Sequence, residues 1–129
     1  MNMNESLSAI NSKILLAEDD PDMRRFLSKA LRNAGFDVAC FDNGKAAYQR
    51  LREEPFELLL TDIVMPEMDG IELARKATEL DPDIKVMFIT GFAAVALNPD
   101  NHAPQQAKVL SKPFHLKELV TEVQRLLAA

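Results

Sequence analysis

Short apolar runs that alternate with helical patterns constrain the fold of this chain more than any other feature of its sequence. The runs span Ile14–Ala17, Val38–Phe41, Leu58–Leu60, Val86–Ile89 and Val109–Leu110. Runs of this length favour strands that are buried on both faces, as in a parallel sheet. Parallel neighbours need long crossover connections, which helices usually supply. The chain is therefore predicted to be an α/β protein.

The clearest helical pattern follows the first apolar run. Asp20 is placed as an N-cap, Pro21 suits the first helical position, and Gly35 suits the position just past the helix end. The apolar stripe of this helix comprises Met23, Phe26, Leu27, Ala30, Leu31 and Ala34. Its solvent-exposed side is predicted to carry the basic residues Arg24, Arg25, Lys29 and Arg32.

Four further helices are predicted from the same kind of pattern. Two of them, Lys45–Glu53 and Ile71–Leu80, end before prolines, and the last runs from Leu116 to Leu127. A short or irregular fourth helix is expected over Ala93–Leu97, because prolines follow it closely. Five strands alternating with five helices predict a five-stranded parallel sheet sandwiched by helices. Residues 13–129 would form this domain, and residues 1–12 a flexible N-terminal tail.

Composition excludes several other classes. The chain has 129 residues, one cysteine (Cys40) and a formal net charge of −5. It therefore has no internal disulfide framework, and it lacks the basic face that nucleic-acid binding normally requires. No apolar run approaches the roughly 20 residues that span a bilayer, and the first residues lack the features of a secretory signal. A cytoplasmic protein is expected.

Polar residues with a common chemistry follow four of the predicted strands. Glu18 and Asp19 follow the first strand, Asp62 the third, Thr90 the fourth and Lys112 the fifth. Ligands of open α/β sheets bind outside the carboxyl ends of the strands, so these side chains are expected to meet at one edge. Carboxylates crowded in this way repel one another unless a cation compensates them.

A magnesium ion would resolve that repulsion, because it prefers oxygen ligands and often binds carboxylates together with phosphate oxygens. Asp19 and Asp62 could ligate it directly, Glu18 could act through water, and a backbone carbonyl just after Asp62 could complete the protein ligands. One carboxylate could instead be a nucleophile that accepts a phosphoryl group. Lys112 and Thr90 suit phosphate oxygens, so the set fits phosphoryl transfer onto Asp62.

In this order, these residues resemble the receiver domain of two-component response regulators. The resemblance rests on Glu18-Asp19, Asp62, Met65-Pro66 with Asp69-Gly70, Thr90, and Lys112-Pro113. It implies a CheY-like, flavodoxin-like fold with strand order 2-1-3-4-5 and a cis Lys112-Pro113 bond. It also implies Asp62 as the phosphoacceptor and Thr90 with Lys112 as the phosphate-sensing pair. Glu18, Asp19, Asp62 and the Val64 backbone carbonyl would hold Mg²⁺.

Within the family, the stretches LLAEDDPDMRRFL and LLTDIVMPEMDGIELA are similar to single-domain, CpdR-type regulators of alphaproteobacteria. This implies control of ClpXP-mediated proteolysis and the cell cycle, with the unphosphorylated form active. The implied partners are a histidine kinase or histidine phosphotransferase and a ClpX-type unfoldase, with recruitment to a cell pole. The terminal Leu-Leu-Ala-Ala is similar to tags that such unfoldases read, although a helix end has the same composition.

Two departures from the family pattern bear on mechanism. Val109 stands where receivers often carry an aromatic residue, so an aromatic rotamer switch is not expected. Val64 and Phe92, two residues after Asp62 and Thr90, are apolar and poorly suited to orient a hydrolytic water. Slow self-dephosphorylation is therefore predicted. The resemblance itself implies a regulator that catalyses only its own phosphotransfer and dephosphorylation.

The residues leave three rival functions open. An Mg²⁺-dependent phosphohydrolase using Asp62 usually has a second aspartate where this chain has Val64. An FMN carrier would need a phosphate loop rich in Ser, Thr and Gly, which is absent. A receiver that binds its partners without phosphorylation would not require the intact set of Asp19, Asp62, Thr90 and Lys112.

Overall fold

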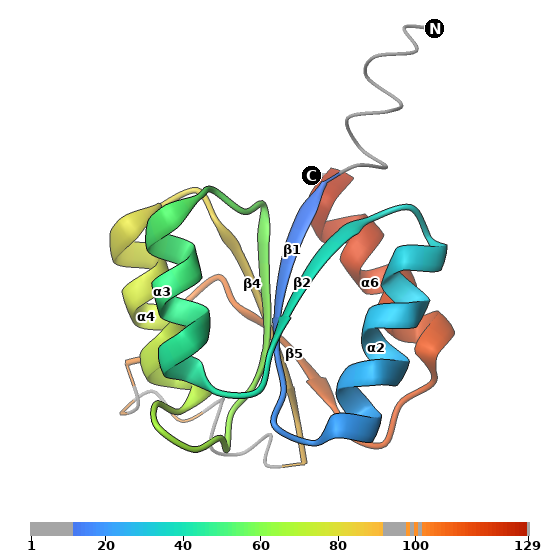
Figure 1. Ribbon diagram of the computed structural model, residues 1–129, viewed down its shortest axis with the longest axis horizontal. Helices are drawn as coiled ribbons and strands as arrows, with labels where there is room; N and C mark the ends of the chain where they lie inside the picture. Colours follow the sequence, from blue (N-terminus) through green and yellow to red (C-terminus); the bar gives the residue numbers. More distant parts are fainter. Residues whose placement is uncertain (1–11, 92–97, 99, 101, 129) are drawn as a thin grey trace, which may run out of the picture.

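The computed structural model describes residues 12–91, 98, 100 and 102–128. Five parallel strands form one sheet in the order β2-β1-β3-β4-β5 (Figure 1). The strands are β1 (Lys13–Ala17), β2 (Asp37–Phe41), β3 (Leu58–Asp62), β4 (Lys85–Thr90) and β5 (Lys108–Ser111). The predicted strand order is confirmed, and the strands extend the predicted apolar runs by one or two residues at their ends.

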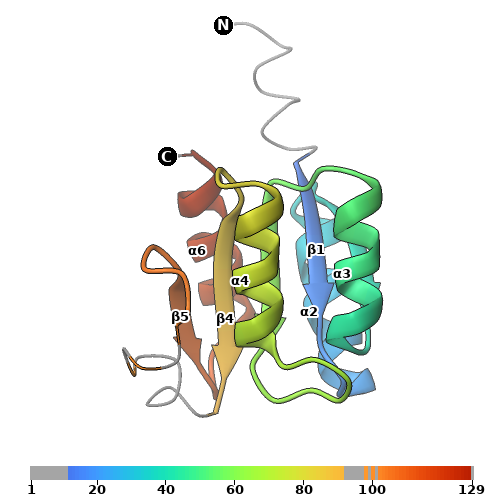
Figure 2. The same cartoon turned by 90° about the vertical axis from the view of Figure 1, so that its left-hand side faces the viewer.

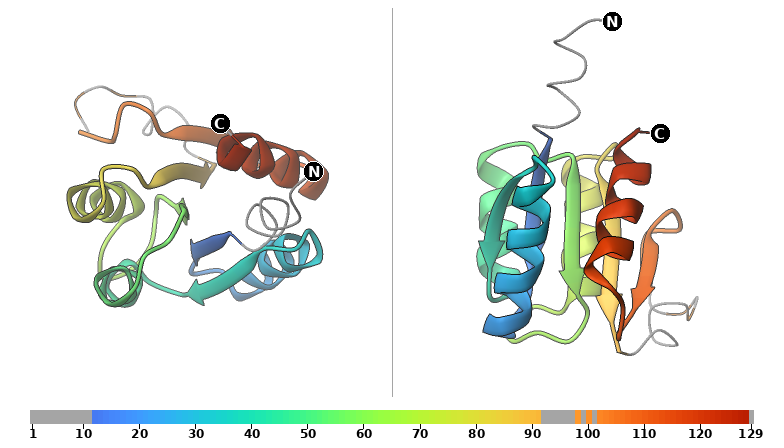
Figure 3. Two further views of the ribbon diagram at one scale, coloured as in Figure 1. Left: turned by 90° about the horizontal axis from the view of Figure 1, so that it is seen from above. Right: turned by 90° about the vertical axis from the view of Figure 1, so that its right-hand side faces the viewer.

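Helices cover both faces of the sheet. The four helices of the described part of the chain are α2 (Pro21–Asn33), α3 (Gly44–Glu53), α4 (Gly70–Leu80) and α6 (Leu116–Ala128). Helices α3 and α4 lie side by side on one face (Figure 2), and α2 and α6 lie on the other (Figure 3, right). The predicted helix over residues 93–97 lies outside the described residues.

Two hydrophobic cores result from the alternation of side chains along the strands. Leu15 and Leu59 face α3 and α4, where they join Ala47 and Leu73. Ile14, Leu16 and Leu60 face α2 and α6, where they join Leu27, Leu31, Leu119 and Val123. Because both faces are buried, the strands read as continuous apolar runs.

Local signals place the helix ends as the sequence predicts. Asp20 caps α2, and its Oδ1 accepts hydrogen bonds from the backbone N–H groups of Asp22 and Met23. After α2, Gly35 adopts a φ of 98°. The Gly35 N–H donates to the carbonyl of Arg32, and the Phe36 N–H donates to that of Leu31. These bonds form a Schellman motif, which requires a left-handed residue at Gly35.

The structure changes two details of the sequence analysis. Phe26 is predicted in the apolar stripe of α2, but 56% of its surface is exposed, whereas Leu27 and Leu31 of the same stripe are fully buried. Ser12 was assigned to the N-terminal tail, yet it is buried and its carbonyl accepts a hydrogen bond from the backbone N–H of Asp37. The rest of the predicted tail, residues 1–11, lies outside the described residues. Among those described, no helix combines the length and apolar character that crossing a membrane requires.

Candidate functional site

The carboxyl ends of the parallel strands lie together at the bottom of Figure 1. The predicted site residues end or directly follow four of these strands. Glu18 directly follows β1, Asp62 ends β3, Thr90 ends β4, and Lys112 follows β5. The register places Asp62 beside Ile89 and Thr90 beside Ser111. Residues that are distant in the sequence therefore meet where the sequence analysis expected them.

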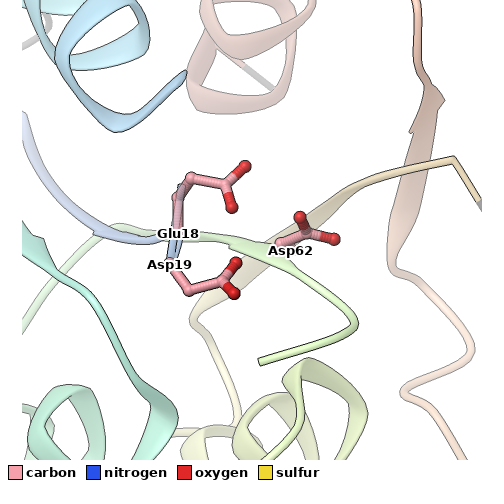
Figure 4. Close-up of side chains that lie close together, drawn as sticks. All are labelled: Glu18, Asp19 and Asp62. Carbon is pink, nitrogen blue, oxygen red and sulfur yellow. The ribbon is translucent and has the colours of Figure 1, made fainter. Parts of the chain in front are cut away.

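Glu18, Asp19 and Asp62 form a cluster of three carboxylates (Figure 4). One carboxylate oxygen of each lies within 4.8 Å of the others. Glu18 is fully buried, Asp62 is buried, and Asp19 is exposed, so the cluster opens to solvent on the Asp19 side. An all-oxygen donor set with one open side fits a magnesium ion that keeps several of its waters.

Lys112 is the cation of this cluster. Its Nζ lies 2.8 Å from Asp62 Oδ2 and 3.1 Å from Glu18 Oε1. The Lys112 ammonium, which extends from the end of β5, therefore bridges the carboxylates at the ends of β1 and β3. The Lys112-Pro113 peptide bond is cis, as the resemblance implied.

Burial and neighbouring charges shift the titration of both partners. Burial, together with the nearby Asp62, raises the pKa of Glu18 to about 7, although Lys112 opposes the shift. Burial alone would lower the pKa of Lys112, but its hydrogen bonds to Asp62 and Glu18 raise that pKa above its ordinary value. The surroundings of Glu18 thus disfavour its charged form, so they also favour the binding of an additional cation that would stabilise that form.

The two oxygens of Asp62 have different partners. Oδ1 accepts a hydrogen bond of 2.7 Å from the backbone N–H of Ile63, and Oδ2 accepts the bond from Lys112. These bonds fix the orientation of the carboxylate. Thr90 is fully buried at the end of β4, and its carbonyl accepts a 2.7 Å hydrogen bond from the backbone N–H of Lys112. Thr90 and Lys112 are therefore linked through the backbone.

The loop between β3 and α4 folds back over the end of β3. The Gly70 N–H donates to the carbonyl of Ile63 at 2.8 Å. A Cβ atom at Gly70 would lie 1.9 Å from the Asp62 carbonyl oxygen, so a side chain there is excluded. Val64 lies in this loop with 58% of its residue surface exposed, and its carbonyl remains a predicted metal ligand.

Two basic residues of α2 have partners that the sequence pattern did not predict. Arg24 was expected on the solvent side, but its guanidinium donates a hydrogen bond of 2.8 Å to the carbonyl of Glu18. Arg32 likewise binds the carbonyl of Val38 at 3.0 Å. Their positions on the helix are compatible with solvent exposure. What they bind depends on how the turn after β1 and the start of β2 lie against α2, which helical spacing does not record.

The raised pKa of Glu18 makes the free energy of unfolding depend on pH. A carboxyl group whose pKa is higher in the folded state stabilises folding below the unfolded value, here 4.5, and this contribution disappears as the pH rises through about 7. In metal-free buffer, Glu18→Gln should therefore be more stable than the parent protein above pH 7, by at most about 3 kcal/mol. The advantage should vanish at low pH. Urea unfolding at a series of pH values in the presence of a chelator measures it.

The exposed Glu53, which pairs with Arg50 on α3, provides the control. Glu53→Gln should give a difference in stability that changes little with pH. A Glu18→Gln advantage that stays constant across the pH range would contradict the assignment of the raised pKa to Glu18.

Comparisons with known proteins agree with this geometry. Residues 14–124 match the family model described as the response regulator receiver domain. The chain is 74% identical over 117 residues to the response regulator receiver protein CpdR of Brucella abortus, covering 91% of this chain and 98% of that protein. It thus also resembles the CpdR-type regulators in particular.

Solved structures show the same fold. A response regulator receiver protein from Sinorhizobium medicae is 33% identical with a TM-score of 0.84, covering 92% of this chain and 96% of that one. The response regulator TrrA from Thermotoga maritima, solved in complex with Mg²⁺ and beryllofluoride, is 25% identical with a TM-score of 0.80. That alignment covers 89% of this chain and 98% of the TrrA chain. With its strand order, its three clustered carboxylates and its bridging lysine, this chain belongs to the response regulator receiver domain family.

Proposed function

We propose that this receiver domain accepts a phosphoryl group on Asp62 with the help of Mg²⁺ and signals through phosphorylation-dependent contacts with other proteins. The observation that carries the proposal is the convergence of Glu18 and Asp19 on Asp62, with Lys112 Nζ 2.8 Å from Asp62 Oδ2. Helices and sheets do not require such a cluster, whereas phosphoryl transfer to a carboxylate does. The protein would catalyse its own phosphotransfer and slow dephosphorylation, and no reaction of an external substrate.

The chain's own residues prepare Asp62 for this transfer. The Ile63 N–H and the Lys112 ammonium each hold one carboxylate oxygen, so the nucleophile is oriented before a donor arrives. An Asp62 oxygen forms a bond to phosphorus as the phosphorus–nitrogen bond of a phosphohistidine breaks. Lys112 offsets the negative charge of the incoming phosphoryl oxygens. A magnesium ion held by Glu18, Asp19, Asp62 and the Val64 carbonyl would neutralise further charge on that group.

Phosphorylation would change the balance of charge at the ends of β4 and β5. The acyl phosphate adds about −1.5 to −2 charges, if it ionises like other phosphate groups. Thr90 and Lys112 would be drawn toward it, and the hydrogen bond between their backbones couples the two. Turning a ~1:99 equilibrium into ~99:1 needs about 5.5 kcal/mol, within reach of a few charge-assisted hydrogen bonds. The family resemblance favours an output surface made of β5, α6 and the predicted helix over residues 93–97, which lies outside the described residues; α2 is the alternative.

The similarity to CpdR supports a more specific role for the chain. We infer that it takes its phosphoryl group from a histidine kinase or histidine phosphotransferase in the cytoplasm. Its unphosphorylated form would engage a ClpX-type unfoldase and promote regulated proteolysis in the cell cycle, with recruitment to a cell pole. No contact with nucleic acid is included in this role, because the net charge of −5 disfavours it.

Intact-mass analysis after incubation with acetyl phosphate and Mg²⁺ tests the phosphoacceptor proposal. The parent protein should gain the mass of one phosphoryl group, and Asp62→Asn should gain none. Asp22→Asn is a matched control, because Asp22 is exposed on the first turn of α2 and should leave labelling unchanged.

The other outcomes identify rival functions. Release of many phosphate molecules per protein would support a phosphohydrolase instead. Absence of any mass gain in the parent protein, in the presence and absence of Mg²⁺, would support an adaptor that acts without phosphorylation. Both outcomes overturn the proposal.

Slow loss of the phosphoryl group is a separate prediction from Val64. Val64 is apolar and exposed, two residues after the phosphoacceptor, so its side chain offers no hydrogen bond to a hydrolytic water. The acyl phosphate should persist for minutes or longer in purified protein. Val64→Gln should shorten its lifetime about tenfold, less than the ~10²–10⁴-fold of a general acid or base, because an amide only orients the water. Phosphate release after removal of the donor measures the lifetime.

The exposed Glu67 of the same loop supplies the control for Val64. Glu67→Gln should leave the lifetime unchanged. Complete loss of the phosphoryl group within seconds from the parent protein would contradict this reading of Val64.

A further inference from the structure

The turn that carries Glu18 and Asp19 lies between the end of β1 and the start of α2. The ladder between β1 and β3 ends with the pair Ala17 and Thr61, so Glu18 lies just beyond it. The backbone N–H of Glu18 still donates to the carbonyl of Phe41 at 3.0 Å, on the β2 side. The Glu18 carbonyl, however, lies beyond the last pair that joins β1 to β3. The turn must therefore be fixed by bonds from outside the sheet.

Arg24 supplies such a bond. From the first turns of α2 its Nη1 donates to the Glu18 carbonyl at 2.8 Å and approaches the Asp19 carbonyl at 3.5 Å. The backbone N–H of Arg24 also donates to the carbonyl of Asp20 at 2.9 Å. One residue thus contacts the carbonyls of all three consecutive acidic residues.

The opposite side of the same turn is fixed by carboxylates. Asp20 Oδ1 caps α2, and the Asp20 N–H donates to Glu18 Oε2 at 3.3 Å. These bonds hold α2 and the Glu18 side chain, but neither binds the Glu18 carbonyl. The guanidinium of Arg24 binds the Glu18 carbonyl itself, so it helps to fix the peptide between Glu18 and Asp19, from which both side chains project.

We propose that Arg24 is a positioning residue of the metal site: by holding the carbonyls of the acidic turn, it keeps the carboxylates of Glu18 and Asp19 directed at Asp62. The inference rests on the proposed Mg²⁺-dependent function of that site. Three carboxylates within 4.8 Å repel one another, and a loose turn would let Glu18 and Asp19 move apart before a cation binds. Arg24 touches neither the phosphoryl group nor the metal ion.

Lysine cannot fully replace arginine in this role. A guanidinium offers several N–H donors in a fixed plane, which suits two carbonyls on consecutive residues. An ammonium keeps the positive charge but lacks this planar arrangement. The Arg24→Lys variant therefore separates the effect of charge from that of geometry.

Calorimetric titration with Mg²⁺ alone tests the proposal, because the chain contains no tryptophan to report binding by fluorescence. Arg24→Gln should weaken Mg²⁺ binding about tenfold, as loss of a supporting partner typically does, and Arg24→Lys should fall between this variant and the parent. Arg25→Gln is the matched control, since Arg25 lies next in sequence, is exposed and pairs with Asp22. It should bind Mg²⁺ like the parent protein.

Phosphorylation kinetics give a second readout that a general structural defect would not reproduce. With acetyl phosphate as the donor, Arg24→Gln should need about tenfold more Mg²⁺ for half-maximal rate, but should reach the parental rate at saturating Mg²⁺. In a Glu18→Gln background the same substitution should weaken Mg²⁺ binding less, because both changes act through one turn.

The outcomes distinguish the inference from the function on which it rests. If the parent protein binds no Mg²⁺ or gains no phosphoryl group, the proposed function fails. If the parent does both, and Arg24→Gln binds Mg²⁺ as Arg25→Gln does, the positioning role is wrong. If Arg24→Gln does not fold, Arg24→Lys decides: parental Mg²⁺ affinity overturns the geometric argument, and weakened affinity supports it.

Discussion

Gly70→Ala is expected to destabilise the protein by about 3 kcal/mol and to abolish efficient phosphorylation of Asp62, because the added methyl group would collide with backbone atoms. The added Cβ would lie 1.9 Å from the Asp62 carbonyl oxygen and 2.8 Å from its carbonyl carbon. Neither atom can move without shifting the phosphoacceptor or α4. The free energy of unfolding in urea and the rate of phosphorylation by acetyl phosphate measure the two effects.

Gly91→Ala is the matched control for this substitution. A Cβ at Gly91, directly after Thr90, would meet nothing within 4 Å. Its stability and labelling rate should stay close to those of the parent protein. Equal behaviour of the two alanine variants would contradict the close approach of the β3–α4 loop to Asp62.

Lys112→Met is expected to lower the free energy of unfolding by about 3 kcal/mol in metal-free buffer at pH 8, since it removes two charge-assisted hydrogen bonds. Both carboxylates would lose their shared cation. The loss is costly because Glu18 is fully buried and the Asp62 side chain is only 11% exposed, so water cannot replace the ammonium. Because Lys112 lowers the pKa of Glu18, its loss would raise that pKa further above about 7. The deficit should therefore shrink at acidic pH, where Glu18 binds a proton.

Magnesium distinguishes this explanation from a simple loss of packing. Added Mg²⁺ should restore much of the stability of Lys112→Met, because a divalent cation compensates the same carboxylates. Lys117→Met, at an exposed position of α6, should change stability little under either condition. A deficit that is insensitive to both pH and Mg²⁺ would show that Lys112 acts in some other way. Chemical unfolding with and without chelator measures each case.

The fold could be predicted from the sequence because its determinants are local and repeated. Strands buried on both faces leave continuous apolar runs, and Asp20 and Gly35 mark the two ends of α2 through their own backbone bonds. The exposure of Phe26 could not be predicted, because helical spacing identifies an apolar side but not how far the sheet extends beneath it.

The composition of the site could also be predicted, but its internal contacts could not. Strand ends in a parallel sheet must share an edge, which brings Glu18, Asp62 and Lys112 together. The bridge from Lys112 to two carboxylates depends on how far its side chain extends from the end of β5 toward the ends of β3 and β1. The Arg24 bond and the contact at Gly70 depend on where a turn and a loop fold back, and no periodic pattern records that.

Reductive trapping of the acyl phosphate, followed by peptide sequencing in a mass spectrometer, tests the central claim most directly. Borohydride converts a phosphorylated aspartate into homoserine, so the modified residue is identified by position. After treatment with acetyl phosphate and Mg²⁺, homoserine should replace aspartate at position 62, and it should be absent when Mg²⁺ is removed by a chelator. Homoserine at Asp19, or at any other aspartate in place of Asp62, would contradict the account.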